Sequence, residues 1–255
     1  MIKKIFGENF DNIPINETEE TIKIDSALSK LEAIEAIKKN KPECPPEILE
    51  SLELVNVKYL GFDGSLHEGQ ILVHHELQND IIDLFHFARS INFPIESVIP
   101  ISKFDDEDEL SMSVNNSSGF NFRTIINQTI ISLHGYGFAI DLNPLLNPVL
   151  EYPKLESGEE DIAAEMVVTQ PKNGNYDVSQ NGTLYKNEEE YHPVVKFLQD
   201  RGWVWGGDWT SFKDYQHFQK PLLTEVYLSN LQKYLENGEI TQEQFESMKA
   251  RAKVV

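Results

Sequence analysis

The pattern of apolar and polar residues predicts a mixed α+β protein. Residues 54–60 alternate as a strand does, Phe62-Asp63-Gly64 is typical of a turn, and residues 70–74 suit a second strand, so we expect a β-hairpin. Residues 76–91 then repeat apolar side chains at helical spacings and predict a helix that packs on the hairpin, with His86 on or near its packed side. The apolar positions of this predicted helix are Ile81, Ile82, Leu84, Phe85 and Ala88.

The first 50 residues are read as a polar extension that carries one amphipathic helix. Within residues 26–39, apolar side chains recur every third position, which favours a helix lying on the main domain. These positions are Leu28, Leu31, Ile34 and Ile37. Cys44-Pro45-Pro46 ends any helix, because proline lacks the amide hydrogen and fixes its own φ. We therefore predict an extension over 1–50, followed by a main domain over 51–220.

The last 35 residues predict a helical hairpin. Residues 222–235 and 241–252 have helical periodicity and are separated by Glu236-Asn237-Gly238-Glu239. Thr241 and Gln244 have the spacing of a capping box at the start of the second helix. We expect the hairpin to span 221–255.

Two segments of the main domain predict loops. The acidic run at residues 105–109 (DDEDE) is typical of an exposed loop, and it lacks the spaced oxygens and glycine of a calcium-binding loop. Residues 143–191 are rich in Asn, Pro, Gly and Glu and have little periodicity, so we expect a long irregular excursion. Such loops often shape a binding cleft.

Composition and charge exclude several classes of function. The chain has 22 Lys and Arg against 42 Asp and Glu, a formal net charge of −20, so it repels a phosphate backbone and nucleic acid is not expected as a partner. A single cysteine, Cys44, excludes both an intramolecular disulfide and a four-cysteine zinc site. The start shows no apolar signal-peptide region, and no segment is apolar enough to cross a membrane.

The first residues that indicate chemistry are His134 and Asp141. Two glycines after His134 permit a tight turn, and residues 138–141 suit a strand. On that strand Ala139 and Asp141 share a face, so Asp141 can face back towards His134. An aspartate on an apolar strand is costly unless a cation compensates it, and a metal ion would do so.

His217 is the second candidate ligand, and Asp214 lies three residues before it. Two histidines and one carboxylate form a known catalytic zinc set that leaves a fourth position for water. Asp214 would then be the base that takes a proton from this water. Because residues three apart on a straight strand face opposite ways, we expect a turn or bulge between Asp214 and His217. The alternative is a structural role, in which each histidine is a hydrogen-bonded core residue that binds no metal.

These residues resemble the zinc D-Ala-D-Ala carboxypeptidase and L-alanyl-D-glutamate peptidase superfamily, which includes VanY-type D,D-carboxypeptidases and phage endolysins. The resemblance rests on Ser132-x-His134-x-x-Gly137-x-Ala139-x-Asp141, followed by Asp214-x-x-His217. Residues 115–123 are also similar to the segment that supplies the family's arginine, and residues 202–209 (GWVWGGDW) to its tryptophan-rich approach to the last histidine. In order and spacing the resemblance covers about residues 54–220.

The resemblance implies an α+β fold in which a small antiparallel sheet, flanked by helices, holds one zinc ion (Zn2+) in a cleft. It further implies roles for individual residues: zinc ligands at His134, Asp141 and His217, the general base and acid at Asp214, and stabilisation of the oxyanion at Arg123. Arg123 in an acidic chain is alternatively a salt-bridge partner. Ser132 either donates a hydrogen bond to the substrate or orients the turn before His134.

Other aromatic and polar residues near this pattern allow structural and functional interpretations. We expect core packing for at least two of Trp203, Trp205 and Trp209, while one could line the cleft. Asp208 suits either an acceptor for a ligand histidine or a turn residue. The remaining histidines are interpreted as structural or exposed: His67, His74, His75, His86 and His192.

The leading hypothesis is a zinc peptidase that hydrolyses an amide bond of the peptidoglycan stem peptide, with a peptide or muropeptide as its substrate. Such a target lies in the cell envelope, so we expect a mature exported form, a phage-released enzyme or an enzyme of cytoplasmic wall fragments. Two alternatives remain open at this point. One is a non-catalytic, zinc-stabilised binding module of the same fold, and the other is an intracellular D,D-dipeptidase with a small closed cleft.

Overall fold

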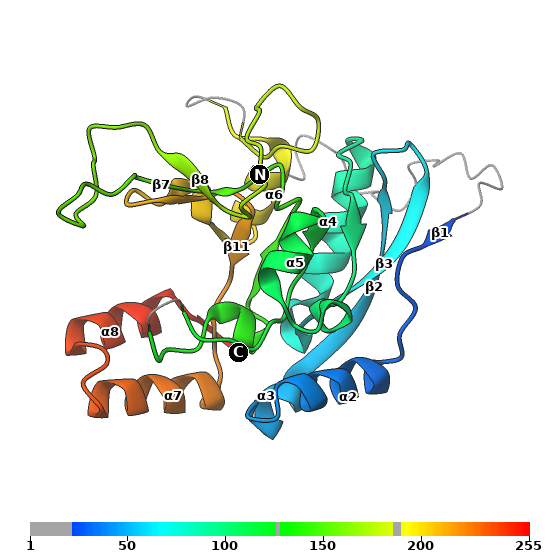
Figure 1. Ribbon diagram of the computed structural model, residues 1–255. Helices are drawn as coiled ribbons and strands as arrows, with labels where there is room; N and C mark the ends of the chain where they lie inside the picture. Colours follow the sequence, from blue (N-terminus) through cyan, green and yellow to red (C-terminus); the bar gives the residue numbers. More distant parts are fainter. Residues whose placement is uncertain (1–21, 126–127, 186–189) are drawn as a thin grey trace.

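The computed structural model describes residues 22–125, 128–185 and 190–255, and it has the predicted α+β class (Figure 1). Residues 1–21 of the predicted N-terminal extension lie outside the described residues. The α-helices are α2 (Lys30–Asn40), α3 (Pro46–Ser51), α4 (Gln78–Ser90), α5 (Asp108–Ser113), α6 (Pro193–Gln199), α7 (Glu225–Glu236) and α8 (Gln242–Arg251). Short 3-10 helices are η2 (His75–Leu77), η3 (Ile101–Phe104), η4 (Leu133–Tyr136) and η5 (Gly206–Asp208).

The strands are short apart from one long hairpin, and they form several small sheets. The strands are β1 (Lys23–Ile24), β2 (Leu52–Leu60), β3 (Leu66–His74), β4 (Ser97–Val98), β5 (Asn116–Ser117), β6 (Ala139–Asp141), β7 (Val149–Glu151), β8 (Val167–Gln170), β9 (Val204–Trp205), β10 (Lys213–Asp214), β11 (His217–Gln219), β12 (Leu222–Leu223) and β13 (Lys253–Val254).

The hairpin of β2 and β3 is confirmed, and α4 packs against it (Figure 1). The two strands pair antiparallel over their whole length, from Leu52 opposite His74 to Leu60 opposite Leu66. The helix buries Ile81, Leu84, Phe85 and Ala88, a stripe at helical spacing. Two expectations for this helix are wrong, because Ile82 and His86 fall outside the stripe and are exposed.

The N-terminal helix is confirmed, although its buried face differs from the predicted one. Helix α2 begins after a capping box in which Ser29 and Glu32 bond reciprocally. Its fully buried residues are Ala33 and Ile37, four positions apart, whereas the predicted Leu31 is 65% exposed. A strict three-residue spacing drifts round a helix of 3.6 residues per turn, so not every position in that series can face the core.

Two three-stranded sheets carry three of the candidate site residues, Asp141, Asp214 and His217. In one, β11 lies between β6 and β9, and all pairs are antiparallel. In the other, β7 lies between β10 and β8, and Val149 of β7 pairs with Asp214 of β10. Within residues 143–191, which are otherwise irregular, strands β7 and β8 are the regular part. Residues 186–189 of this segment lie outside the described residues. This excursion therefore pairs directly with the strand of Asp214.

The C-terminal helical hairpin is also confirmed. Its first helix starts at Glu225, later than predicted, because Leu222–Leu223 instead pair with β13. The capping box of Thr241 and Gln244 is present at the start of α8. The hydroxyl of Tyr234 accepts a hydrogen bond from the Ile131 amide (3.1 Å), so α7 braces the loop before His134.

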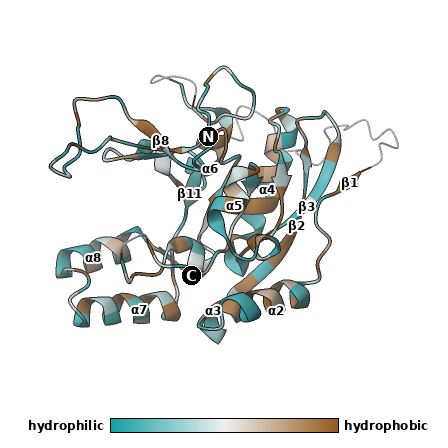
Figure 2. Ribbon diagram, in the orientation of Figure 1, coloured by the Kyte–Doolittle hydropathy of each residue, from teal (hydrophilic) through white to brown (hydrophobic). Residues whose placement is uncertain are grey.

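One continuous cluster of buried apolar side chains runs through the described residues, from Ala33 in α2 to Ala252 after α8. Figure 2 shows the contrast between the apolar stretches of β2 and β3 and the mainly hydrophilic α8. The acidic run is not simply an exposed loop, because Asp106 is buried and α5 begins at Asp108. No described helix has the length and apolar character needed to span a membrane. The predicted division at residues 50 and 220 stays a prediction.

Candidate metal centre and active site

The loop that carries His134 is tightly built. Ser132 caps η4, and its Oγ accepts a hydrogen bond from the His134 amide (3.4 Å), so the structure shows the turn-orienting role. Gly137 ends η4 with φ +70°, and a Cβ there would lie 2.6 Å from the His74 amide nitrogen. Only glycine combines this left-handed conformation with so close an approach. The sharp turn then leads into β6, which ends at Asp141.

Strand pairing brings the other two candidate ligands together. In the antiparallel pair of β6 and β11, Asp141 and His217 are direct partners, so their side chains leave the sheet side by side. Residues 215–216 form a turn between β10 and β11, as the spacing of Asp214 and His217 predicted. His134, Asp141 and His217 are all buried.

The separations of the three candidate ligands fit a metal ion. His134 Nε2 lies 3.1 Å from His217 Nδ1 and 3.3 Å from Asp141 Oδ2, and His217 Nδ1 lies 3.2 Å from Asp141 Oδ1. Ligands about 2.0–2.1 Å from a tetrahedral zinc ion lie about 3.3 Å from one another. The described residues therefore contain a His/Asp/His group that could hold a metal ion.

Hydrogen bonds to the outer nitrogens fix the tautomers of both histidines. His134 Nδ1 lies 2.7 Å from the Gly119 carbonyl oxygen, and His217 Nε2 lies 3.0 Å from Gln219 Oε1. Both partners are acceptors, so these nitrogens carry the hydrogens. In the neutral rings, His134 Nε2 and His217 Nδ1 each carry a lone pair. These two lone pairs face each other and the Asp141 carboxylate. A cation between them would remove this repulsion, and partners of this kind are typical of metal-bound histidines.

The pKa shifts of Asp141 and His217 also favour a cation at this point. Burial raises the pKa of Asp141, but the charges and hydrogen bonds of His134 and His217 outweigh it and hold the pKa well below its ordinary value. For His217 burial lowers the pKa, yet Asp141 and Asp214 raise it more, so the net shift is upward. The two carboxylates thus favour positive charge at this point.

Asp214 is a partly exposed residue whose Oδ1 atom is buried and has no hydrogen-bond partner among the described residues. Burial, opposed by His217 and reinforced by Asp141, raises the pKa of Asp214 to about 6. A carboxyl group with a pKa near the working pH can both take up and release a proton. Gly206 packs against it so closely that a Cβ there would lie 2.5 Å from the Asp214 carbonyl oxygen.

Arg123 is joined to the site through its backbone, and its side chain forms an ion pair. Its carbonyl oxygen accepts a hydrogen bond from the Ser132 amide (3.0 Å), and the nearby Asn121 amide donates to the His134 carbonyl (3.1 Å). The guanidinium Nε lies 3.0 Å from Asp108 Oδ2. This is the salt bridge that the sequence offered as an alternative, although the buried Nε makes no hydrogen bond among the described residues.

Two of the three tryptophans are buried in the core, as predicted, whereas Asp208 and His67 have unexpected partners. Trp203 and Trp205 are 2% and 0% exposed, and Trp209 is half-buried with its ring centroid 5.4 Å from that of His217. Asp208 accepts hydrogen bonds from Tyr191 and Gln199, so it is not the acceptor for a ligand histidine. His67, interpreted from the sequence as structural or exposed, bonds Asp25 (2.9 Å) and lies 3.2 Å from Asp63.

The sequence interpretation missed the two groups that orient the histidines. Gly119 acts through its backbone carbonyl, which no side-chain pattern reveals. Gln219 could have been found, because residues i and i+2 on a strand share a face and Gln219 follows His217 at that spacing.

Comparison with known proteins identifies the segment that holds these residues. Residues 126–220 match the sequence profile of a family described as D-alanyl-D-alanine carboxypeptidase. The predicted superfamily resemblance is confirmed. Ser132, His134, Asp141, Asp214 and His217 lie inside the matched segment, and Arg123 lies just before it.

A curated relative gives a second match. The chain is 32% identical over 88 residues to the peptidoglycan L-alanyl-D-glutamate endopeptidase CwlK of Bacillus subtilis (strain 168). The aligned part is 34% of this chain and spans 38% of the relative's length. No solved structure gives a significant match.

Proposed function

We propose that the protein is a zinc-dependent peptidase that hydrolyses an amide bond of the peptidoglycan stem peptide. The observation that carries the proposal is the buried triangle of His134, Asp141 and His217, in which outer hydrogen bonds turn both inner lone pairs towards a common point. Its support from known proteins is the family of residues 126–220 and the peptidoglycan endopeptidase named among the relatives.

His134, Asp141 and His217 would hold the zinc ion. A bound zinc ion lowers the pKa of a coordinated water towards about 7 and polarises a substrate carbonyl. Zinc is favoured over calcium or magnesium because two of the three donors are imidazole nitrogens, whereas those hard cations take oxygen ligands.

Asp214 would take a proton from the attacking water and deliver it to the amine that leaves. Its raised pKa suits this exchange, and its unpartnered Oδ1 is free to accept the proton. The water oxygen forms a bond to the amide carbon, the C–N bond breaks, and the proton held by Asp214 completes the leaving amine. No covalent intermediate with the protein is needed.

Arg123 would stabilise the negative charge that develops on the carbonyl oxygen. Its guanidinium Nε lies 3.0 Å from Asp108 Oδ2, and a guanidinium has several N–H donors that can face an oxyanion. Ser132 would donate its hydroxyl hydrogen to the substrate, while its oxygen accepts from the His134 amide. With this substrate, the protein acts in the cell envelope or after release by a phage.

The test is release of amino groups from purified muropeptides, with products assigned by mass spectrometry. Wild type is compared with Asp214→Asn, both loaded with zinc, and with Glu156→Gln as a matched exposed-carboxylate control. We expect cleavage by wild type and by Glu156→Gln, and a loss of at least about 1,000-fold in kcat for Asp214→Asn with zinc retained. A folded, zinc-loaded wild type that cleaves no stem peptide would favour the binding-module alternative instead.

A further inference from the structure

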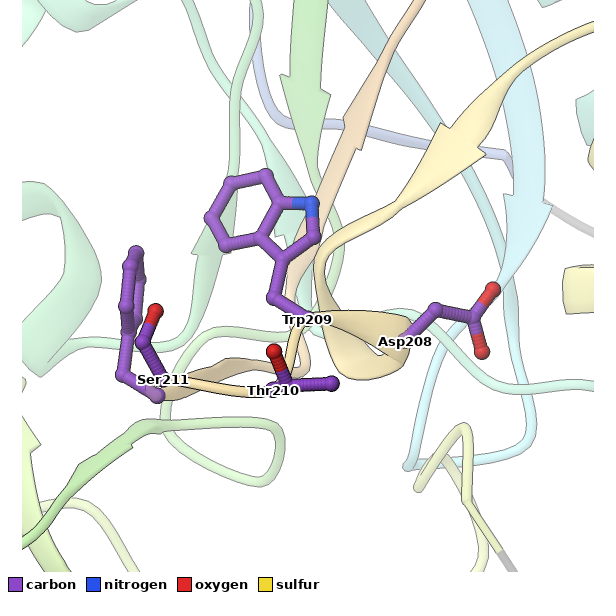
Figure 3. Close-up of a pocket in the computed structure, with 5 residues that line it drawn as sticks. Asp208, Trp209, Thr210 and Ser211 are labelled. Carbon is purple, nitrogen blue, oxygen red and sulfur yellow. The ribbon is translucent and has the colours of Figure 1, made fainter.

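An open pocket lies beside the candidate metal centre. Its volume is about 440 Å³, and it is lined by the consecutive residues Asp208, Trp209, Thr210, Ser211 and Phe212, between η5 and β10 (Figure 3). The rings of Trp209 and Phe212 meet edge to face, with centroids 5.0 Å apart. Trp209 also contacts the imidazole of His217, so one wall of the pocket is shared with the site.

Trp209 differs from the other two tryptophans of the chain. Trp203 and Trp205 are buried and donate their indole hydrogens to Asp80 Oδ2 and the Tyr215 carbonyl, at 2.9 Å each. Trp209 is half-buried, and the described residues provide no hydrogen-bond partner for its indole nitrogen. A large ring left partly in solvent with an unused donor is typical of a ligand-binding surface.

Of the five residues that line the pocket, only Asp208 has an acidic or basic side chain, although the protein has a net charge of −20. The Asp208 carboxylate accepts hydrogen bonds from Tyr191 and Gln199 at 2.8 Å each. Figure 3 shows this carboxylate pointing away from the Trp209 ring. The pocket therefore offers two aromatic faces and the hydroxyls of Thr210 and Ser211. This composition suits an uncharged ligand with a flat apolar face and a polar rim.

We propose that this pocket binds the N-acetylhexosamine ring to which the stem peptide is attached. The C–H face of such a ring would stack on Trp209, and its hydroxyl and acetamido groups would bond Thr210 and Ser211. The inference rests on the proposed function, because it places the sugar next to a peptide bond at the metal centre. It also selects a bond: the scissile amide lies near the sugar end of the stem peptide, not at its D-Ala-D-Ala end. The charged side chains farther along the stem would gain little from a pocket of aromatic rings and hydroxyl groups.

Binding can be measured without hydrolysis through tryptophan fluorescence. Zinc-loaded protein is titrated with the disaccharide of N-acetylglucosamine and N-acetylmuramic acid, with its lactyl carboxylate capped as the methyl amide because the stem peptide caps it in the substrate. We expect a saturable change in emission in wild type that Trp209→Leu abolishes and Phe212→Leu weakens. Phe62→Leu is the matched control, because Phe62 is another partly exposed ring, 42% exposed and in the β2–β3 turn. A titration that leaves wild-type emission unchanged overturns the inference.

Kinetics on two substrates separate the sugar from the peptide. The substrates are a disaccharide-linked stem peptide and the same peptide without sugar. We expect Trp209→Leu to raise KM about 3- to 10-fold more on the first substrate than on the second, since one aromatic contact contributes about 0.5–1.5 kcal/mol. Trp209→Phe should be intermediate. An equal rise on both substrates would assign the pocket to the peptide and overturn the inference.

The two experiments distinguish failure of the inference from failure of the proposed function. Wild type that binds the disaccharide but cleaves neither substrate leaves the sugar pocket standing and removes the peptidase. Wild type that cleaves both substrates equally well and does not respond to the disaccharide keeps the peptidase and removes the pocket. Zinc content and circular dichroism of each variant confirm that it is folded.

Discussion

Asp141 and His217 lie directly opposite each other on the paired strands β6 and β11, and Asp141 Oδ1 is 3.2 Å from His217 Nδ1. The register of one strand pair therefore places two of the three candidate ligands. A shift of one residue would turn one side chain of the pair to the other face of the sheet. The third ligand, His134, comes from η4, whose turn at Gly137 returns the chain to β6.

Asp141→Asn is expected to weaken zinc binding by at least about 100-fold. This loss exceeds the one expected when a residue that only orients a ligand is removed, because Asp141 would itself bind the metal. The change keeps the shape of the side chain but removes the negative charge that faces both histidines. Zinc affinity is measured by competition with a chromophoric chelator. The exposed carboxylate variant Glu156→Gln should bind zinc like wild type. Unchanged affinity in Asp141→Asn would remove Asp141 from the ligand set.

Gln219→Ala is expected to weaken zinc binding about 10- to 100-fold, because Gln219 Oε1 accepts from His217 Nε2 and holds the ring with Nδ1 inward. Gln219→Glu keeps an acceptor at the same place and should restore most of the affinity. The same chelator competition measures both variants. Equal losses in Ala and Glu would show that Gln219 acts through packing and not through this hydrogen bond.

The ligand residues could be predicted from the sequence because their chemistry and strand alternation act locally. His134, Asp141 and His217 each belong to a short pattern, and the turn between Asp214 and His217 followed from their three-residue spacing. Their convergence could not be derived from these patterns alone, because it depends on β11 pairing with β6 across more than 70 positions of sequence. The family resemblance supplied that long-range information.

The errors in the fold have local physical causes. Leu31 and Ile82 were placed on packed faces because they are apolar, yet the phase of each helix is set by which neighbours bury it. The run at residues 105–109 was read from charge alone, but Asp108 has a tertiary partner in Arg123 that charge patterning cannot identify. Gly119 contributes a carbonyl oxygen, which every residue possesses.

Gly206→Ala is expected to lower kcat about 10- to 100-fold with zinc retained. The added Cβ would lie 2.5 Å from the Asp214 carbonyl oxygen and 2.9 Å from its Cβ, so Asp214 must move. Displacement of a catalytic group by about 1 Å can cost about 100-fold in rate. Stem-peptide hydrolysis and zinc content are measured on the same samples.

The control for this variant is Gly69→Ala, which creates a comparable clash elsewhere. A Cβ at Gly69 would lie 2.3 Å from the Val98 carbonyl oxygen, in the β3–β4 region. It should lower thermal stability but leave kcat of the folded protein near the wild-type value. If both variants lowered kcat equally, the effect of Gly206→Ala would be general destabilisation.

His74 is expected to make the fold less stable in mild acid. Burial, reinforced by the neighbouring His75, lowers the pKa of His74 to about 4 from an ordinary value near 6.5. Between these values the unfolded chain binds a proton that the folded protein does not. The stabilisation is therefore complete above about pH 6.5 and is lost as the pH falls towards 4.

His74→Asn should remove this pH dependence. Asn keeps an acceptor for the Glu76 amide, which now bonds His74 Nδ1 at 3.3 Å, but it does not titrate. Urea unfolding is followed at pH 7.5 and pH 5 after zinc removal, with the exposed His86→Asn as control. From pH 7.5 to 5, wild type should lose about 2 kcal/mol more than His74→Asn. Equal losses in wild type and His74→Asn would show that His74 is protonated in the folded state.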